Sequence, residues 1–427
     1  MKRRGGPDCI RLRVRELACA LALALAAPAG AVETAIIVSP AASTGAEMAF
    51  GIGVDGTTIG IGAPGENDVA GAAYVVDCAT LPCGAPLRIA PAELLAADAF
   101  GTALSLSADT LVVTAAGAMP GAAYVFLGGG GGWTQQAKLM PSGLATGERF
   151  GQSASLAGDR VAIGAGRVGV SGTGAVYVFV RSGTAWSEEA KLTPSDGAPF
   201  DAFGTSVALD EDTIVVGAPM KASTTPGSYA NGAAYVFMRG AGGWTEQAKL
   251  TAPGANGDLF GYAVAVADGH AVIGAPYANN AQGEAYVFTQ SGTTWTQQAI
   301  LTTAAGAAGD EFGWSVAIGT DSVFVGAPFA GQFNGAACGA SYVFDAASLA
   351  ETGGTTITAP VVDELAGWSV AASGVRWVTS APGHLVGDVV HAGAAYWFDP
   401  TITIFHAGFD ASGACVAPEN VSPRVAR

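Results

Sequence analysis

The sequence has few of the side chains on which catalysis and cofactor binding usually depend. Its 427 residues include only four histidines, at positions 270, 384, 391 and 406, without the regular spacing of a metal site. It also contains neither a Gly-x-Ser-x-Gly elbow nor a Walker phosphate loop. We therefore expect that the protein is not an enzyme and needs no cofactor, although a triad assembled from distant residues stays open.

Basic residues are scarce as well. There are 19 Lys and Arg against 35 Asp and Glu, which gives a formal net charge of −16. Six of the basic residues lie in the first 15 positions, so the rest of the chain is more acidic still, at about −20 after residue 31. Such a field opposes nucleic acid and anionic lipid, and we expect neither as a partner.

Long apolar runs are absent too. Leu17 to Ala27 is an apolar run of 11 residues, well short of the roughly 20 that span a bilayer. It follows a basic start and precedes Ala29-Gly30-Ala31, which fits the small-x-small cleavage pattern of a secretory signal. We expect residues 1–31 to be a signal peptide and the protein to be secreted, extracellular or at the cell surface. A membrane anchor is the weaker alternative.

Glycine, in contrast, is abundant, with 62 residues, and the chain repeats itself. After each repeat start come an apolar run, a short turn and a second apolar run, which ends in Gly-Ala-Pro in copies such as 326–328. A regular period of this size indicates a propeller or a solenoid. The starts are the Phe-Gly pairs at 50/51, 100/101, 150/151, 203/204, 260/261 and 312/313, with Ala366-Gly367 in the seventh place.

A third and a fourth run complete the repeat. The third reads GAAYVF at 232–237, and the fourth reads WTQQAKL at 133–139. Four strands in each of seven repeats predict an all-β fold, a seven-bladed β-propeller of four-stranded antiparallel blades, because one such sheet cannot bury both of its faces. We expect the propeller to span residues 32–405 and a C-terminal tail to occupy 406–427.

The two ends of the propeller complement each other. Residues 36–40, IIVSP, match the fourth-run segment AKLTP at 190–194, whereas the seventh repeat ends at GAAYWF without a Trp-to-Leu run. The sequence therefore predicts that residues 32–38 pair with blade seven as its outer strand. Residues 401–405, TITIF, compete for the same place.

These repeats resemble the FG-GAP repeat of integrin alpha-subunit heads, and still more closely the bacterial secreted FG-GAP proteins with W..QAKL before each Phe-Gly pair. The resemblance covers nearly all of the chain after residue 31. It implies a propeller that binds a protein or a surface polymer, without indicating which one, because the repeat is a scaffold.

Packing and turn geometry account for the repeated residues. The Phe of each pair suits the space between two sheets, and its Gly suits the bend into the next blade. The acidic residue two positions before the Phe, as at Asp98 and Asp310, is expected to accept backbone N–H groups. The lysines of the fourth run are expected to discourage edge-to-edge pairing; they are Lys138, Lys191 and Lys249.

The integrin resemblance also implies calcium loops of the form Asp-x-Asp-x-Asp-Gly between the first and second strands. None of the seven corresponding turns contains this motif, and Asp210, Glu211 and Asp212 come nearest to it. We therefore expect no metal, and we expect turns such as IGTDS at 318–322 only to reverse the chain.

The segments between the second and third strands vary most, above all 219–232, 328–339 and 382–393. They follow equivalent strands, so they should emerge on one face of the ring, and scaffolds usually carry recognition on such loops. The binding residues that we expect in them are Lys221, Tyr229, Asn231, Gln332, Phe333, Asn334, His384 and Asp388.

Two other functions stay open. A lectin-like propeller could stack sugars on Trp314, Trp368 or Trp377, although core packing is the simpler role for these side chains. A hydrolase would need an acid and a histidine together, as Asp388 and His384 are in one loop, for which an exposed loop is the simpler interpretation.

Four cysteines follow residue 31, and none forms a Cys-x-x-Cys redox motif. Four cysteines allow three pairings, of which the short separation favours Cys78 with Cys83, leaving Cys338 with Cys415. We therefore expect a secreted, monomeric and disulfide-bonded propeller that recognises an extracellular protein or polysaccharide.

Overall fold

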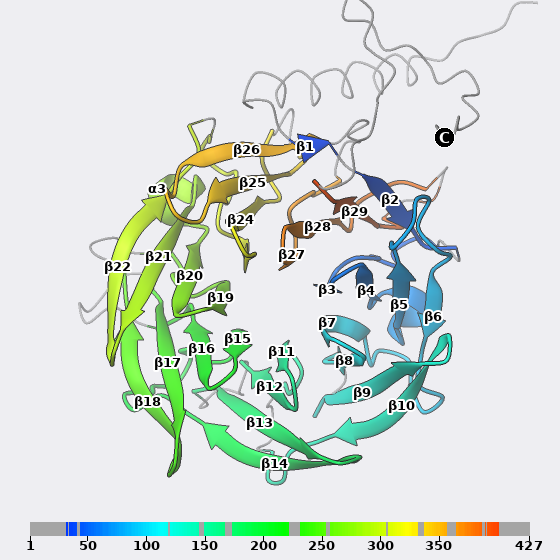
Figure 1. Cartoon of the computed structure of the whole chain (residues 1–427), viewed down its shortest axis with the longest axis horizontal. Helices are drawn as coiled ribbons and strands as arrows, with labels where there is room; N and C mark the ends of the chain where they lie inside the picture. Colours follow the sequence, from blue (N-terminus) through cyan, green and yellow to red (C-terminus); the bar gives the residue numbers. More distant parts are fainter. Residues whose placement is uncertain are drawn as a thin grey trace, which may run out of the picture.

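The chain forms seven β-sheets arranged as the blades of a closed ring (Figure 1). The computed structural model describes residues 31–32, 34–40, 43–117, 120–144, 149–166, 173–221, 231–252, 257–304, 306–331, 337–356, 364–386, 389 and 391–400. The fold class expected from the repeats is confirmed, because each of the seven blades contains four antiparallel strands. In six blades these strands follow one another along the chain, and in the seventh the outer strand comes from the N-terminal side.

The blades follow one another around the ring. Blade one contains β3 (Ile52–Asp55), β4 (Thr58–Ala63), β5 (Ala72–Asp77) and β6 (Leu87–Ile89). Blade two contains β7 (Phe100–Ser107), β8 (Thr110–Ala115), β9 (Ala122–Gly129) and β10 (Gly132–Leu139). Blade three contains β11 (Ser153–Ala157), β12 (Arg160–Ala165), β13 (Ala175–Ser182) and β14 (Ala185–Leu192). Blade four contains β15 (Ser206–Asp210), β16 (Thr213–Ala218), β17 (Ala233–Gly240) and β18 (Gly243–Leu250).

The remaining blades complete the circle. Blade five contains β19 (Val264–Ala267), β20 (His270–Ala275), β21 (Glu284–Ser291) and β22 (Thr294–Leu301). Blade six contains β23 (Ser315–Ile318), β24 (Ser322–Ala327), β25 (Ala340–Asp345) and β26 (Glu351–Thr356). Blade seven contains β27 (Val370–Ser373), β28 (Arg376–Ala381), β29 (Ala394–Phe398) and, from the other end of the chain, β2 (Ala35–Val38). Two one-turn helices, α2 (Glu66–Val69) and α3 (Ala278–Ala281), lie in the loops of blades one and five.

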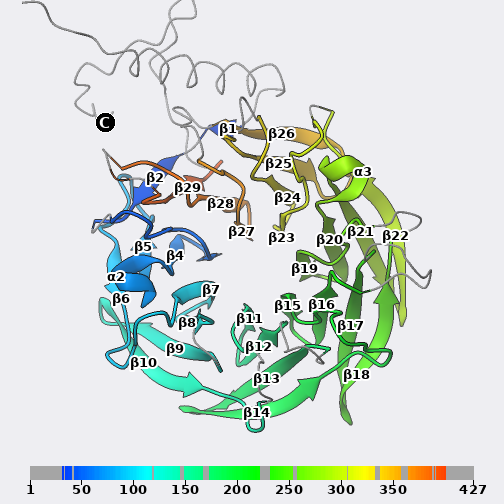
Figure 2. The ribbon, with the colours of Figure 1, turned by 180° about the vertical axis from the view of Figure 1, so that it is seen from behind.

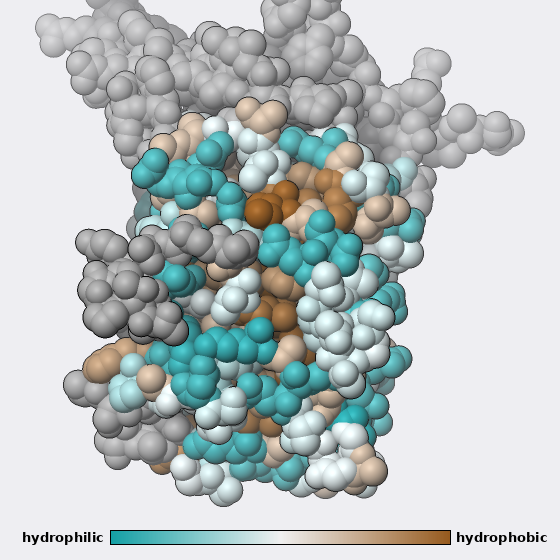
Figure 3. Space-filling model, turned by 90° about the vertical axis from the view of Figure 1, so that its left-hand side faces the viewer, coloured by the Kyte–Doolittle hydropathy of each residue, from teal (hydrophilic) through white to brown (hydrophobic). Residues whose placement is uncertain are grey.

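The position of a strand within its blade explains its sequence. First strands surround the central axis, and fourth strands form the outside of the ring (Figures 1 and 2). Both faces of the third strands are covered by neighbouring blades. These strands are buried over five consecutive residues in β9, β13 and β17, so they carry apolar side chains on both faces. The outer strands are largely exposed, and the surface seen from the side is mostly polar or neutral (Figure 3).

The Phe of the Phe-Gly pair packs between sheets, as predicted. Phe100 is fully buried, with its ring 5.5 Å from that of Tyr124 and 6.1 Å from that of Phe126. Phe150, Phe203, Phe260 and Phe312 repeat this arrangement with the Tyr and Phe of their own third strands. Edge-to-face geometry of this kind adds to the stabilisation from burial.

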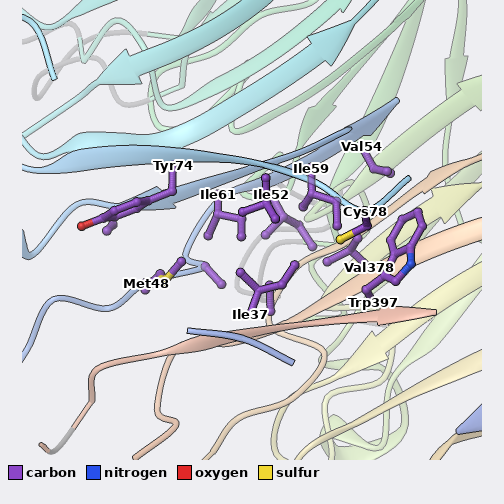
Figure 4. Close-up of a cluster of buried hydrophobic side chains, with 14 of the residues drawn as sticks. Ile37, Met48, Ile52, Val54, Ile59, Ile61, Tyr74, Cys78, Val378 and Trp397 are labelled. Atoms are coloured by element: carbon purple, nitrogen blue, oxygen red, sulfur yellow. The ribbon is translucent and has the colours of Figure 1, made fainter. Parts of the chain in front are cut away.

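The assignment of Phe50-Gly51 to the first repeat was wrong by two residues. Met48 occupies the place of the Phe, because it forms with Gly393 the parallel bridge that Phe100 forms with Gly71. Met48 is fully buried beside Tyr74 in the cluster drawn in Figure 4. Met is an adaptable apolar side chain and fills the same space. The Phe-Gly motif gives no sign that Met48 replaces the Phe in this blade.

The ring closes through its N-terminal strand, as predicted. β2 pairs antiparallel with β29, with Ile37 opposite Ala395, and supplies the fourth strand of blade seven. Ile37 and Trp397 then pack against blade one (Figure 4). The pairing with blade seven covers residues 35–38 and not the predicted 32–38. Val32 instead belongs to β1 (Ala31–Val32), which pairs in parallel with β26 of blade six, a contact that the sequence did not predict. Residues 401–427, including TITIF, and residues 1–30 lie outside the described residues.

The acidic residue before the Phe acts on the backbone, as predicted. The carboxylates of Asp98, Asp201 and Asp310 each accept the backbone N–H three residues earlier, at 2.7 to 2.8 Å. Glu148 lies outside the described residues, and Asp258 makes no such bond with any residue that the structure describes.

The fourth-strand lysines have a more specific role than expected. The Nζ atom of each lies over the ring of the third-strand Tyr opposite it, at distances of 5.1, 4.9 and 5.6 Å for Lys138, Lys191 and Lys249. These are cation–π contacts within a blade, in addition to any effect of the charge on edge pairing.

The turns between first and second strands reverse the chain and connect blades. In the turn IGTDS, the backbone N–H of Gly319 donates to Ser322, and that of Thr320 donates to Gly374 of blade seven. The carboxylate of Asp210 accepts the N–H of Asp268 in the next blade, at 2.9 Å. These turns thus use their oxygens to link neighbouring sheets.

One of the two predicted disulfides lies in the described part of the chain. Cys78 and Cys83 are bonded to each other, with their Cα atoms 4.3 Å apart, in the connection from β5 to β6. Cys338 is buried beside β25, and its predicted partner Cys415 lies outside the described residues.

Candidate functional site

The loops between second and third strands share a face with the connections from one blade to the next. The backbone N–H of Met220, in the loop after β16, donates to the carbonyl of Asp201, in the connection that enters the same blade. Equivalent bonds join Tyr277 to Asp258 in blade five and Gly383 to Glu364 in blade seven. We call the surface formed by these two sets of segments the loop face. The one-face arrangement predicted for the variable loops is thus present where they are described.

Exposed apolar side chains gather on the loop face. Among the residues described, eleven large apolar side chains are exposed, and six of them lie in segments of this face: Val69, Leu95, Met140, Phe200, Met220 and Tyr277. Only Leu81 and Val375 lie in loops of the opposite face, and the other three lie on outer strands. These six side chains are distributed over segments of blades one to five. Exposed apolar groups that adjoin one another indicate an interaction surface.

Phe200 and Met220 are the most prominent of these side chains in blade four. They are 63% and 51% exposed, and the bond from Met220 to Asp201 brings them onto neighbouring segments. Neither was expected from the sequence. For Met220 the sequence contained a signal. Met220, Tyr277 and Phe329 all occupy the position directly after Gly-Ala-Pro, and an alignment of the repeats reveals this recurring large apolar residue.

Lys221 is not free at this surface. It is only 9% exposed, and its Nζ atom lies 2.8 Å from Oδ2 of Asp201 and 2.5 Å from the carbonyl oxygen of Asp196. An ammonium buried between two acidic residues stabilises the loop, since a buried charge needs its partners. Its place in the structure favours a supporting role over contact with a ligand.

Asn231 begins the return from the same loop. It is half-buried, and its Oδ1 atom is buried without a hydrogen-bond partner in the described structure. The other expected binding residues of the three loops, namely Tyr229, Gln332, Phe333, Asn334 and Asp388, lie outside the described residues.

His384 belongs to a buried polar cluster of blade seven. Its Nδ1 atom is 2.9 Å from Oε1 of Glu364 and 3.2 Å from the hydroxyl of Tyr396, which itself bonds to Glu364. Glu364 is fully buried at the position that Asp310 holds in blade six. Because the Glu364 carboxylate is buried and bonded to both side chains, the cluster ties the loop of His384 to β29.

A row of aromatic side chains lies where four connections enter the first strands. Ring centres are 4.6 Å apart for Tyr262 and Trp314, 4.9 Å for Trp314 and Trp368, and 5.5 Å for Trp368 and Phe50. All four are half-buried and occupy equivalent positions in blades five, six, seven and one. The equivalent residues of blades two, three and four are polar: Thr102, Gln152 and Thr205. The inner edge of the loop face is therefore aromatic on one side and polar on the other.

The third tryptophan considered for sugar stacking lies elsewhere. Trp377 is 5% exposed, and its ring stacks between those of Phe324 and Phe398, at 5.0 and 4.9 Å. It belongs to the core between blades six and seven. Of the three, only Trp314 and Trp368 are placed near a surface.

The acidic side chains and the helices of the described residues bear on two other kinds of site, a metal site and a membrane span. Within the described ranges, no group of three or more His, Cys, Asp or Glu residues is arranged to hold a metal ion. Asp212, one of the three acids nearest to a calcium motif, is paired with Arg239 at 3.4 Å. No helix among the described residues has the length and apolar character needed to cross a membrane.

Comparison with known proteins gives one informative match. The model of the FG-GAP repeat matches residues 88–126, 133–179, 186–237, 244–288 and 295–344, which together are more than half of the chain. Each match runs from the outer strand of one blade to the third strand of the next. The crystal structure of Saccharomyces cerevisiae Sqt1 is similar at 12% identity and a TM-score of 0.47, covering 86% of this chain and 99% of that one. No curated protein matches the sequence.

Proposed function

Because the chain belongs to the FG-GAP repeat family, we propose that it is a non-catalytic binding protein of the adhesion type, which recognises an extracellular protein or a surface polymer through its loop face. The observation that carries this proposal is the concentration of exposed apolar side chains on that face. The repeated residues themselves are occupied with packing, so recognition falls to the segments that vary.

Composition of the loop face supports this role. Phe200, Met220 and Tyr277 offer apolar anchors, and the exposed Asn279 and Asn280 that follow Tyr277 offer polar groups. Large apolar and aromatic groups with a polar surround are what specific interfaces use. The acidic net charge of −16 favours a partner with basic groups.

Secretion is part of the proposal. It is supported by the signal-like segment at residues 1–31, by the disulfide between Cys78 and Cys83, and by the occurrence of FG-GAP repeats in extracellular proteins. Mass spectrometry of the exported protein is expected to find an N-terminus near Val32.

Carbohydrate binding is the second candidate. It is favoured by the half-buried aromatic row that contains Trp314 and Trp368, opposite the polar residues of blades two to four. Aromatic faces next to hydrogen-bonding groups suit sugar rings, which have apolar C–H faces and polar edges. A Trp314→Ala variant that loses glycan binding while it keeps protein binding would identify this mode.

The test compares variants of the two faces. The double variant Phe200→Ser, Met220→Ser removes exposed apolar groups from the loop face, and Val375→Ser, on the opposite face, is the matched control. Each is assayed against a glycan array and against immobilised extracellular matrix proteins and polysaccharides. We expect the double variant to lose binding and the control to retain it, with both unfolding at the same temperature as the parent. Equal loss in both variants would contradict recognition by the loop face.

A further inference from the structure

Blade four has a polar cluster on the loop face in which every charge is matched. The carboxylate of Asp196 accepts the hydroxyl of Tyr235 at 2.6 Å on Oδ1 and the ammonium of Lys249 at 2.6 Å on Oδ2. The same ammonium lies 5.6 Å from the centre of the Tyr235 ring. A second lysine, Lys221, neutralises the buried Asp201 at 2.8 Å. Two carboxylates and two ammonium groups thus surround one tyrosine.

Blade five has the same architecture without either lysine. Ile300 stands opposite Tyr286 in the register, where Lys249 stands opposite Tyr235. Ala278 takes the position of Lys221, two residues after the Pro of Gly-Ala-Pro. Both acids nevertheless remain, because Asp258 corresponds to Asp201 and a new carboxylate is present at Glu284.

Glu284 is specific to this blade. The first residue of the third strand is Ala in the other six blades, at positions 72, 122, 175, 233, 340 and 394. The carboxylate of Glu284 accepts the hydroxyl of Tyr286 at 2.5 Å on Oε2 and the side-chain amide of Asn279, in α3, at 2.6 Å on Oε1. The Tyr-carboxylate pair of blade four is therefore present again in blade five, with its carboxylate supplied by the first residue of β21. Figure 1 shows α3 next to the strands of this blade.

The two acids of blade five have no cationic partner. Neither Asp258 nor Glu284 takes part in an ion pair with the residues that the structure describes, and the side chain of Asp258 accepts no hydrogen bond from them. Asp258 is nevertheless only 4% exposed. A buried carboxylate without a partner is costly, and a cation supplied from outside would remove that cost.

The ionisation of the two clusters reflects this difference. Burial, with a smaller contribution from Glu284, raises the pKa of Asp258. Burial and the bond to Glu284 also hold the pKa of Tyr286 well above its usual value. In blade four, burial would likewise raise the pKa of Asp196, but the bonds from Lys249 and Tyr235 outweigh it and lower the pKa to about 2.

We propose that blade five binds the ammonium group of a lysine side chain from a protein partner, in the place that Lys249 occupies in blade four. The cation would meet the Tyr286 ring and the carboxylate of Glu284, as Lys249 meets Tyr235 and Asp196, while its methylene chain crosses Ile300, which is 44% exposed. The buried charge of Asp258, which corresponds to the Lys221 partner Asp201, would add attraction from behind the site. The three donors of an ammonium match the acceptors that the site offers. The inference rests on the proposed function only for the source of the lysine, which is a partner at the loop face.

The site can be tested with a small probe. Ligand-observed NMR measures binding of Nα-acetyl-lysine N-methylamide to the full protein, with Nα-acetyl-norleucine N-methylamide as the probe that lacks the ammonium. We expect the lysine probe to bind and the norleucine probe to bind at least roughly tenfold more weakly, because the cation supplies most of the attraction. Equal binding of the two probes would overturn the proposal.

Two variants locate the binding. Ile300→Lys supplies the missing ammonium from within the chain and is expected to abolish binding of the lysine probe, whereas Ile300→Leu keeps it. Glu284→Ala restores the residue of the other six blades, so it is expected to fold. It should weaken binding of the lysine probe by roughly tenfold or more. Unchanged binding in both Ile300→Lys and Glu284→Ala would place the lysine elsewhere. If Ile300→Lys does not fold, Glu284→Ala decides.

Competition separates a lysine site from a metal site and from the proposed function. Millimolar CaCl₂ should leave binding of the lysine probe unchanged beyond the effect of an equal ionic strength of NaCl, and displacement by calcium alone would overturn the assignment. The loop-face variant Phe200→Ser, Met220→Ser leaves blade five intact and should keep the probe. If the protein binds the lysine probe but the loop-face variant binds partners as the parent does, the proposed function fails. If the loop-face variant loses partner binding but the parent does not bind the probe, the lysine site fails.

Discussion

At the scale of single residues, glycine decides how closely neighbouring blades approach. A Cβ atom built on Gly62, the Gly of the first Gly-Ala-Pro, would lie 2.0 Å from the carbonyl oxygen of Gly101, the Gly of the next Phe-Gly pair. The same contact joins Gly217 to Gly261 and Gly274 to Gly313, at 1.9 Å in each case. The Gly-Ala-Pro motif of one blade and the Phe-Gly pair of the next therefore meet in a backbone contact between sheets, and their glycines allow this close approach.

Gly62→Ala should be strongly destabilising for this reason. Backbone atoms cannot move away from the new methyl group without separating blades one and two, and we expect a loss of about 3 kcal/mol or more in the free energy of unfolding. Gly129→Ala is the control, because a Cβ there meets nothing within 4 Å. Urea unfolding of both variants gives the comparison, and equal effects would show that the contact between blades is unimportant.

Asp196 should make stability depend on pH. Its folded pKa is about 2 against an ordinary value of 3.8, so its contribution is fully present above pH 3.8 and is lost as the pH falls towards 2. Because its side chain is 46% exposed, we expect Asp196→Asn to cost only about 1 kcal/mol at pH 7. Urea unfolding from pH 7 to pH 2 should show the two stabilities converging below pH 4. A gap that stays constant over this range would contradict the assignment.

At the scale of secondary-structure elements, β2 determines whether the ring is closed. It is the only outer strand that comes from the opposite end of the described chain, and it covers the edge of β29 that the other blades cover with their own fourth strands. Such an edge would otherwise expose unpaired backbone groups and the apolar face of blade seven.

Substitutions in β2 should separate its buried side from its exposed side. Ile37 is 4% exposed and packs in the core between blades seven and one, so Ile37→Ala is expected to cost about 2 to 4 kcal/mol. Its neighbour Ile36 is 44% exposed, and Ile36→Ala should change the free energy of unfolding by less than about 0.5 kcal/mol. Thermal or urea unfolding measures both, and similar costs at the two positions would refute the strand pairing.

At the scale of the whole molecule, neighbouring blades are joined by the packing of their first strands and by hydrogen bonds between their turns. First strands pack on one another around the full circle, and side chains of their turns bond from blade to blade, as Asp55 does to the N–H of Ala108 at 2.5 Å. In two of these turns, the carboxylates of Asp55 and Asp210 are therefore engaged with the backbone of the next blade.

Calcium should consequently leave the stability of the ring unchanged. A site of micromolar affinity would raise the free energy of unfolding by about 4 kcal/mol at a thousandfold excess of the ion. We expect the midpoint of thermal unfolding in EDTA and in millimolar CaCl₂ to agree within about 1 °C, at matched ionic strength. A shift of several degrees on chelation would demonstrate a bound ion and would overturn the interpretation of the turns.

For the site, the sequence indicated the face and missed most of the described residues on it. The variable loops pointed to the correct side of the ring, because equivalent strands must end on the same side. Whether a given side chain is exposed depends on its neighbours in space: Lys221 is enclosed by Asp196 and Asp201, whereas Phe200, with no comparable cover, is 63% exposed.

The sequence by itself determined the number of blades, the order of their strands and the closing role of β2. The repeat period, the alternation of apolar and polar residues and the complementary ends of the chain can all be read directly from the residues. Tertiary structure alone decided that Met48, and not Phe50, fills the first inter-blade position, since that choice depends on which residue pairs with Gly393 at the far end of the chain. It also decided that the two acids of blade five, Asp258 and Glu284, have no cationic partner among the described residues, because the partners of a charge are set by distances across strands and loops.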